Sequence, residues 1–284
     1  MISVVFGFLT ATLWGLGAIP AARSSRRIGE LATLAWVMLI GLVVAVPIAV
    51  IGGAPEGGVA TSTLGWLALA GVTNVAGLAC AYAALRRGKV GVVAAFLSTE
   101  GAAAALLSIV AGERVAAPVL IGMTLAAAGV VVVARGERGS AERETGSSDP
   151  KALIFAAAGA IIFGFTLFAS GNAADDVPAS WVALPARVVG VTVLILAVAG
   201  GFRLQRPSRR IGWAVLVGLI EVAGLICFAI GARNSIAITS VVASQFSVIS
   251  VLAAFTFERE RLTPAQLAGL LTVCGGVALI AGFG

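Results

Sequence analysis

The chain of 284 residues contains no histidine, few charged residues and only three cysteines. The lack of histidine excludes histidine-based acid–base catalysis, histidine metal ligation and a serine–histidine triad. No glycine-rich phosphate loop precedes a Lys-Ser or Lys-Thr pair, which excludes a P-loop ATPase within this chain. The cysteines form no CxxC pair, so the sequence predicts neither a metal site nor a cofactor. These absences argue against an enzyme.

Apolar residues are what the chain has in abundance. Hydrophobic residues make up 60% of it and charged residues 11%, and the mean hydropathy is +1.07. A soluble domain is typically about half apolar and about a quarter charged. The net charge is +6, but the basic residues form short clusters without interleaved aromatics, unlike a nucleic-acid surface. The composition predicts a protein embedded in the lipid bilayer that binds no nucleic acid.

Ten stretches are long and apolar enough to span a membrane, which takes about 20 residues per helix. They cover residues 2–20, 31–52, 64–84, 90–111, 118–134, 152–171, 181–201, 212–232, 237–256 and 265–283. The first stretch has no basic residue before it and three arginines just after it. This order is the reverse of a signal peptide and suits a retained helix. The predicted fold class is an all-α membrane protein with ten transmembrane helices.

The basic residues alternate between the gaps that separate these stretches. The odd-numbered gaps hold 16 of the 19 lysines and arginines: Arg23, Arg26, Arg27, Arg86, Arg87, Lys89, Arg135, Arg138, Arg143, Lys151, Arg203, Arg206, Arg209, Arg210, Arg259 and Arg261. The even gaps hold only Arg114 and Arg233. Because lysine and arginine are retained on the cytoplasmic side, the odd gaps are predicted to face the cytoplasm and both termini to face outward.

The longest polar gap divides the chain into two halves of five segments each. We expect a first repeat over 1–134, a cytoplasmic linker over 135–151 and a second repeat over 152–284, since the gap has linker composition. Adding 147 carries Gly77-Leu78 onto Gly224-Leu225, and upstream an offset of 149 carries Gly41 onto Gly190.

The two repeats are predicted to lie in opposite orientations. Because each repeat has an odd number of segments, the second enters the membrane in the opposite sense to the first. Inverted repeats are characteristic of secondary transporters, which bind substrate near the midplane and rock one repeat against the other. This is the strongest indication of function that the repeats and charges provide.

Several short motifs resemble the EamA domain of the drug/metabolite transporter superfamily. They are Trp14-Gly15, Ala84-Leu85-Arg86, Gly112-Glu113-Arg114, Gly122 and Gly129-Val130 in the first half, and the run from Glu260 to Gly269 in the second. The resemblance covers essentially the whole chain, as two EamA domains. It implies ten helices, a central cavity largely from helices 1, 3, 4, 6, 8 and 9, and movement of small metabolites or drugs across the inner membrane. Many relatives are exporters.

The chain departs from this family at Glu100 and Ser247. Relatives often carry a proline at these positions in helices 4 and 9, so its absence here predicts loss of the helix break in both halves. The departure also puts a carboxylate in the middle of the membrane. An ionised group at that depth costs about 2.5–3.5 kcal/mol on insertion scales. Such a residue is a candidate for function.

Three charged residues lie within apolar stretches: Glu100, Arg187 and Glu221. Asn74, the repeat equivalent of Glu221, is a fourth polar candidate. Asn74 and Glu221 each have glycines three residues before and after them, so both are predicted to point into the bundle. Two interpretations stay open. A glutamate binds a cationic group or a coupling proton, or Arg187 forms a salt bridge with one glutamate, which leaves the other without an arginine partner.

Further candidates are polar or aromatic residues without charge. Gln245 and Ser247 are expected to hydrogen-bond either a substrate or a neighbouring helix, and Ser98 lies beside Glu100. Trp14 is expected either to line the cavity or to pack in the bundle. The glycines Gly122, Gly129, Gly269 and Gly276 are expected to set helix packing.

These features together predict a secondary transporter that works by alternating access. It is expected to export a small metabolite or drug across the cytoplasmic membrane, with proton coupling and a homodimer left open. The alternative is a flippase for a lipid or lipid-linked carrier. The predicted partners are the small-molecule substrate and the lipid bilayer.

Overall fold

The computed structural model describes residues 1–283 apart from 56, 89, 146–148, 205–210 and 259–263, and the side chains of 133–145, 251, 254–258, 266, 270 and 281 are also outside the description. The first half forms α1 (Ile2–Ile28), α2 (Glu30–Ile51), α3 (Thr61–Arg87), α4 (Val90–Leu97), α5 (Glu100–Val110) and α6 (Ala117–Thr145). The second forms α7 (Pro150–Ala174), α8 (Ala179–Val182), α9 (Leu184–Ala199), α10 (Gly212–Ala232), α11 (Ile236–Ala243), α12 (Phe246–Glu258) and α13 (Pro264–Phe283). The signature residues 260–263 and several predicted basic residues, among them Lys89 and Arg259, lie outside the described residues.

The described part of the chain is all-helical, as its hydropathy predicts. Seven of its helical stretches are long and apolar enough to cross a membrane, and shorter apolar helices cover 117–132, 236–250 and 267–280. The chain is therefore a multi-span membrane protein. α6 continues to Thr145, past the expected end at residue 134, because alanine, glutamate and arginine in this stretch are good helix formers.

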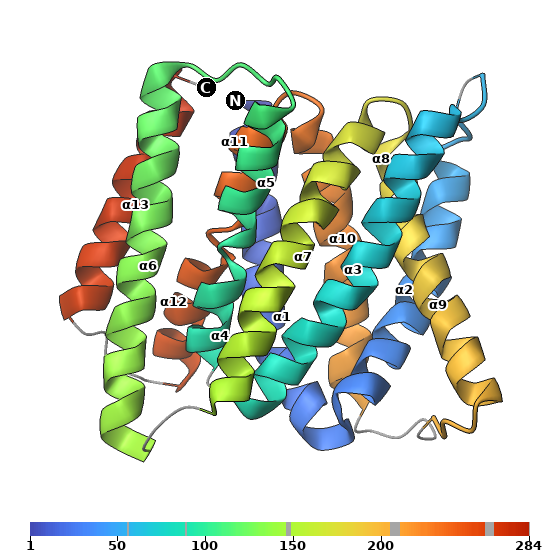
Figure 1. Ribbon diagram of the computed structural model, residues 1–284, viewed down its shortest axis with the longest axis horizontal. Helices are drawn as coiled ribbons and strands as arrows, with labels where there is room; N and C mark the ends of the chain where they lie inside the picture. The colour runs from blue at the N-terminus through green and yellow to red at the C-terminus, as the bar shows by residue number, and fades with distance from the viewer. Residues whose placement is uncertain (56, 89, 146–148, 205–210, 259–263, 284) are drawn as a thin grey trace.

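The two halves interlock instead of forming separate lobes. The most extensive helix contacts join α6 to α13, α3 to α7 and α1 to α10, and each pair takes one helix from each half. The 149 and 147 offsets relate α1 to α7 and α3 to α10, so the pairs α1–α10 and α7–α3 are equivalent. In Figure 1 the pair α6–α13 lies at one side of the bundle and α2–α9 at the other.

Glycines allow α6 and α13 to approach closely. A Cβ atom built on Gly122 would lie 2.7 Å from the carbonyl oxygen of Gly276, and one on Gly276 would lie 2.6 Å from the carbonyl oxygen of Gly122. Gly129 faces the carbonyl oxygen of Gly269 in the same way, at 2.8 Å. This confirms that these glycines set helix packing.

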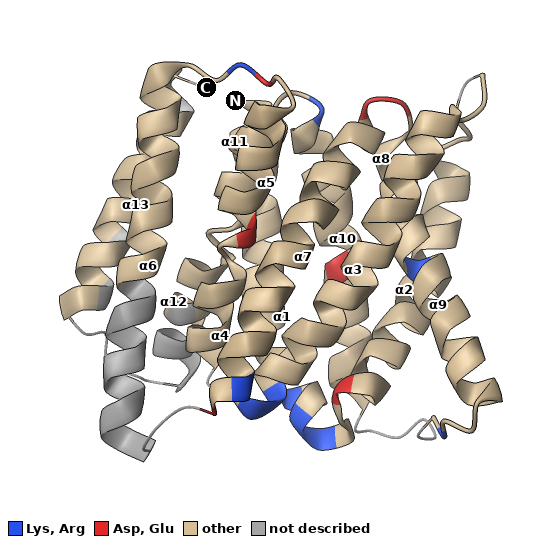
Figure 2. Cartoon of the chain, viewed as in Figure 1, with Lys and Arg blue, Asp and Glu red and all other residues tan. Residues whose placement is uncertain are grey.

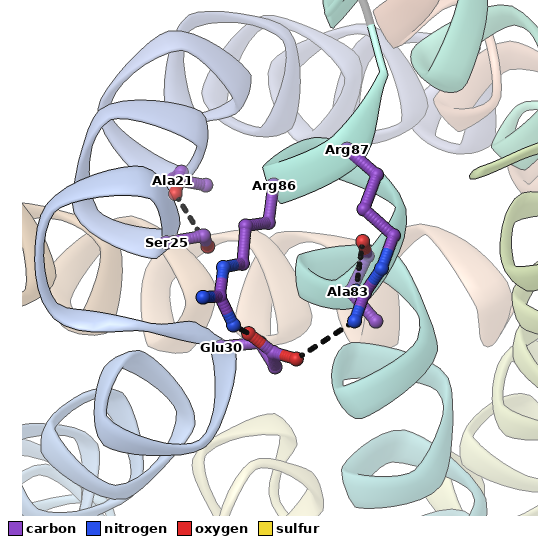
Figure 3. Close-up of polar contacts among 6 residues, drawn as sticks. All are labelled: Ala21, Ser25, Glu30, Ala83, Arg86 and Arg87. Carbon is purple, nitrogen blue, oxygen red and sulfur yellow. Dashed lines mark hydrogen bonds and ion pairs between the residues drawn. The ribbon is translucent and has the colours of Figure 1, made fainter. Parts of the chain in front are cut away.

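Charge separates the two ends of the bundle. Both termini lie at one end, and most of the lysine and arginine that the structure describes lies at the opposite end (Figures 1 and 2). We call this second end, which carries most of the described lysine and arginine, the basic end. There Glu30 at the start of α2 forms ion pairs with Arg86 and Arg87 at the end of α3, the latter at 3.3 Å (Figure 3). The alternating charge pattern in the sequence thus corresponds to two ends of the fold.

Two predicted helices are interrupted, contrary to the expectation from their missing prolines. The stretch 90–111 is divided into α4 and α5 at Ser98 and Thr99, and the stretch 237–256 into α11 and α12 at Ser244 and Gln245. Side-chain hydroxyls take the place of proline: Ser98 donates to the carbonyl of Ala95 and Ser244 to that of Val241, both at 2.8 Å. Such local hydrogen bonds compete with the helix ladder and bend it.

Candidate functional site

A cavity lies between the two halves. Its empty volume is about 700 Å³, which includes space open to solvent. The helices that line it are α1, α3, α4, α5, α7, α10 and α12, which correspond to predicted segments 1, 3, 4, 6, 8 and 9. This is the set of helices that the family resemblance implies. The polar or aromatic lining residues are Trp14, Asn74, Tyr82, Glu100, Phe163, Thr166, Glu221 and Phe246.

The cavity walls repeat one arrangement in both halves. Trp14 of α1 packs against Gly224 of α10, where the ring leaves no room for a Cβ atom. Phe163, which the offset of 149 relates to Trp14, packs against Gly77 of α3 at 2.7 Å from an ideal Cβ position. Trp14 also meets Phe246 edge to face, with ring centroids 6.5 Å apart. Trp14 thus lies in the cavity lining and also packs against a helix of the other half.

Glu221 is paired with an arginine that lies outside the cavity wall. The Arg187 side chain is fully buried, and its Nη2 lies 3.9 Å from Oε2 of Glu221. Among the residues that the structure describes, the Nε and Nη2 groups of Arg187 have no hydrogen-bond partner. A buried ion pair with incomplete hydrogen bonding does not strengthen the fold by itself, but either charge alone would be costly.

Arg187 lies where the two halves meet. Its Nη1 is 3.5 Å from the sulfur of Met38, which is its repeat equivalent by the offset of 149. The guanidinium packs on Gly41, while Met38 packs on Gly190, the equivalent of Gly41. Each of these two side chains thus packs on a glycine of the other half, and the two contacts occupy equivalent positions in the sequence.

Glu100 is the carboxylate without an arginine partner. It lines the cavity, only 4% of it is exposed, and it begins α5 directly after the interruption. The described residues provide no hydrogen bond or ion pair to its side chain. The amino-terminal end of α5 favours a negative charge at this point. The expectation that one glutamate lacks an arginine partner thus fits Glu100.

Two further buried polar groups in the cavity wall have unused hydrogen-bonding atoms. Asn74 is 3% exposed and Tyr82 2% exposed. Neither the amide oxygen of Asn74 nor the hydroxyl of Tyr82 has a hydrogen-bond partner among the described residues. A buried polar group without a partner costs about 1–3 kcal/mol. The sequence reasoning missed Tyr82, although it is the single tyrosine of the chain and lies within a predicted span.

The remaining sequence candidates lie beside the cavity and outside its lining. Ser98 bonds within its own helix, and the amide nitrogen of Gln245 donates to the carbonyl of Val241 at 2.8 Å. Ser247 is fully buried, and its hydroxyl has no partner in the described structure. Ser98 and Gln245 lie in the interruptions of the two helices, and Ser247 lies in the first turn of α12. At their crossing a Cβ atom on Gly101 would overlap the backbone of Ser240.

The cavity extends toward the basic end and is closed toward the end that holds the termini. Its lining reaches Ala21 and Leu85, close to the arginines that follow α1 and end α3. At the other end Ser3 donates to the carbonyl of Gly231 at 3.1 Å, and a Cβ atom on Gly7 would lie 2.9 Å from the Cβ of Val242. The lining thus reaches toward the basic end, while the helices pack closely at the end that holds the termini.

The family model of the EamA-like transporter family matches residues 1–135 and 150–282. A solved structure described only as "Crystal structure of protein" superposes with a TM-score of 0.72 at 20% sequence identity, over 98% of this chain and 95% of that chain. At this identity the likeness concerns the fold alone. No curated protein matches the chain.

Proposed function

The chain belongs to the EamA-like transporter family, and we propose that it exports a small cationic metabolite or drug across the cytoplasmic membrane in exchange for protons. Transport in general follows from the family. We infer the substrate charge and the proton coupling from the cavity, and we take export from the family resemblance. The observation that supports the substrate charge and the coupling is the carboxylate of Glu100, which has no arginine partner among the described residues and lines the cavity between the two halves. Alternating access would expose this carboxylate to each side in turn.

The charges around the cavity support a single exchangeable cation. Glu100 and Glu221 together carry two negative charges when ionised, and Arg187 supplies one positive charge. The group is therefore neutral when it holds one more positive charge, either a proton on Glu100 or a cationic substrate beside it. Because both would use the same carboxylate, binding one displaces the other. Competition of this kind couples export of the substrate to entry of a proton.

The exchange can be tested by following ligand binding and proton release together. The purified protein in detergent is screened by thermal shift against amino acids, nucleosides, cationic amines and lipid headgroups at two pH values. A ligand at about 100 times its dissociation constant stabilises by about 2.7 kcal/mol. A stabilising amine should release a proton into a weakly buffered solution, and Glu100→Gln should abolish that release. Proton release that persists in Glu100→Gln would exclude this exchange, and stabilisation by lipid headgroups alone would favour a flippase.

Alternating access is tested separately with single cysteines in a variant without Cys80, Cys227 and Cys274. Ala21→Cys lies in the cavity lining toward the basic end, and Ser240→Cys lies in the packed crossing of the helices. An impermeant thiol reagent should modify Ala21→Cys from the cytoplasmic side. It should modify Ser240→Cys from the outside only. Modification of both from the same side would contradict alternating access and the predicted orientation.

A further inference from the structure

We infer that the substrate is a protonated amine with an apolar body and a hydrogen-bond acceptor, as in an amino alcohol. The hydroxyl of Tyr82 donates a hydrogen bond to this acceptor. This inference rests on the proposed function and names the substrate class for the same cavity. It is based on three lining groups: the carboxylate of Glu100, the amide oxygen of Asn74 and the hydroxyl of Tyr82.

Glu100 and Asn74 fit an ammonium group. Glu100 supplies a buried carboxylate in the cavity lining, and Asn74 supplies an amide oxygen that has no hydrogen-bond partner among the described residues. An ammonium group has three N–H donors and no acceptor, so it can satisfy both. No lysine or arginine is in the lining, and the chain has no histidine. An anionic substrate would find only negative charge there.

Tyr82 fits an acceptor on the same ligand. Its hydroxyl is buried in the cavity wall and has no hydrogen-bond partner within the described part of the chain. Phenylalanine would fill the same apolar surroundings without leaving a donor unused. The repeat equivalent of Tyr82 is Ala229, so the hydroxyl occurs in one half only. A ligand oxygen that accepts from Tyr82 would complete its hydrogen bonding while the ammonium group occupies Glu100.

The rest of the lining is apolar and suits a hydrocarbon body. Leu78, Leu97 and Val217 contribute aliphatic surface, and Phe163 and Phe246 contribute aromatic surface. Pockets for small molecules are lined in this way, with a few polar groups that fix orientation. The expected ligand therefore combines one charge, one acceptor and a compact apolar group.

Four related compounds separate these features: phenylalaninol, 2-phenylethylamine, 3-phenylpropan-1-ol and hydrocinnamate. Their binding to the full-length protein in detergent is measured by isothermal titration calorimetry. Phenylalaninol should bind about tenfold more tightly than 2-phenylethylamine, which corresponds to one hydrogen bond of about 1.4 kcal/mol. The neutral alcohol and the anion should bind more weakly than both amines. Equal or tighter binding of hydrocinnamate would overturn the inference.

Variants then assign the preference to residues. Tyr82→Phe should bring the affinity for phenylalaninol down to that for 2-phenylethylamine, and Asn74→Asp should tighten both amines. Ser180→Ala is the matched control, because Ser180 also has a buried hydroxyl without a partner but lies outside the cavity lining. A uniform loss across all four compounds in Tyr82→Phe would show that the hydroxyl only positions neighbouring groups, and would refute its role in selection.

The same experiments distinguish failure of this inference from failure of the proposed function. If none of the amines binds while the cysteine variants still show access from alternate sides, the substrate class is wrong and the transporter proposal stands. If the accessibility does not alternate, the proposed function itself fails. Both arms use the intact chain, and the melting temperature of each variant shows whether it is folded.

Discussion

The two halves of the molecule share a backbone plan and differ in charge. Small residues occur at equivalent positions of the two halves. An aromatic ring packs on both Gly77 and Gly224, and a long side chain packs on both Gly41 and Gly190. Polar residues do not repeat. The equivalents of Asn74, Glu100 and Met38 are Glu221, Ser247 and Arg187. The packing contacts thus repeat between the two halves, while the residues of the proposed site differ between them.

The largest effect should come from making the second half resemble the first at the position of Arg187. Arg187→Met introduces the equivalent residue but leaves the partly buried carboxylate of Glu221 without its cation. Breaking a buried ion pair in this way costs about 3–5 kcal/mol. We expect a marked fall in melting temperature in detergent. Adding Glu221→Asn, the equivalent of Asn74, should restore most of the loss.

The double variant sharpens this comparison because it removes both charges together. A double variant no more stable than Arg187→Met would mean that the ion pair is not the reason for the loss. Arg187 would then stabilise through its packing on Gly41.

The next effect concerns the equivalent glycines under the aromatic rings. Gly77→Ala and Gly224→Ala should each lower stability by about 1–3 kcal/mol, because a methyl group would collide with Phe163 or Trp14. The measurement is the melting temperature in detergent. Gly65→Ala is the matched control, since nothing lies within 4 Å of its Cβ position on the same helix as Gly77. A loss in one half only would show that the aromatic contacts are not equivalent.

A smaller effect is expected at the start of α11. Glu113 accepts a hydrogen bond from the hydroxyl of Ser235 and lies 3.1 Å from the backbone nitrogen of Ala237. Glu113→Ala should cost about 0.5–2 kcal/mol, the usual effect of losing a helix cap. Glu113→Gln keeps an acceptor and should recover part of this stability. An unchanged melting temperature in Glu113→Ala would show that Ser235 alone caps the helix.

The sequence predicts the fold in more detail than the site. Hydropathy and charge indicate a multi-span helical protein, and glycine spacing correctly indicates that Asn74 and Glu221 face the interior. Seven of the predicted spans meet the length and apolarity of a crossing helix, and the count of ten stays a prediction. The missing prolines predict two uninterrupted helices, and this prediction is wrong because proline is not the only cause of a helix interruption. In fact Ser98 and Ser244 bend the helices through hydroxyl bonds to their own carbonyls.

The pairing of charges could not be read from the sequence. Whether Arg187 pairs with Glu221 or Glu100 depends on how α9 packs on α2, which is distant from it along the chain, and on which side chain of α10 then faces Arg187. Tyr82 was missed for a related reason, because a lone aromatic in an apolar helix is indistinguishable from a packing residue. Its role becomes visible only when the cavity shows which polar atoms have no partner.

The smallest expected effect lies at the ends of the two repeats, where equivalent positions carry opposite charges. Asp175 and Asp176 directly follow α7. The offset of 149 relates them to Arg26 and Arg27, which lie in the last turn of α1. Burial, helped by the neighbouring Asp176 and opposed by Arg233, raises the pKa of Asp175. The folded protein thus holds this proton more tightly than the unfolded chain. Stability from Asp175 is therefore highest below its unfolded pKa and falls as the pH rises through the folded value.

Asp175→Asn removes this loss at higher pH. We expect a gain below about 0.5 kcal/mol near neutral pH, since surface substitutions rarely do more. The gain should shrink as the pH is lowered and Asp175 itself becomes protonated. Arg26→Gln is the matched variant of the other repeat. Arg26 donates to the carbonyl of Gly88 at 2.7 Å, so its loss should lower stability instead. Melting temperatures that change in the same direction in both variants would mean that the opposite charges at these equivalent positions do not act through local electrostatics.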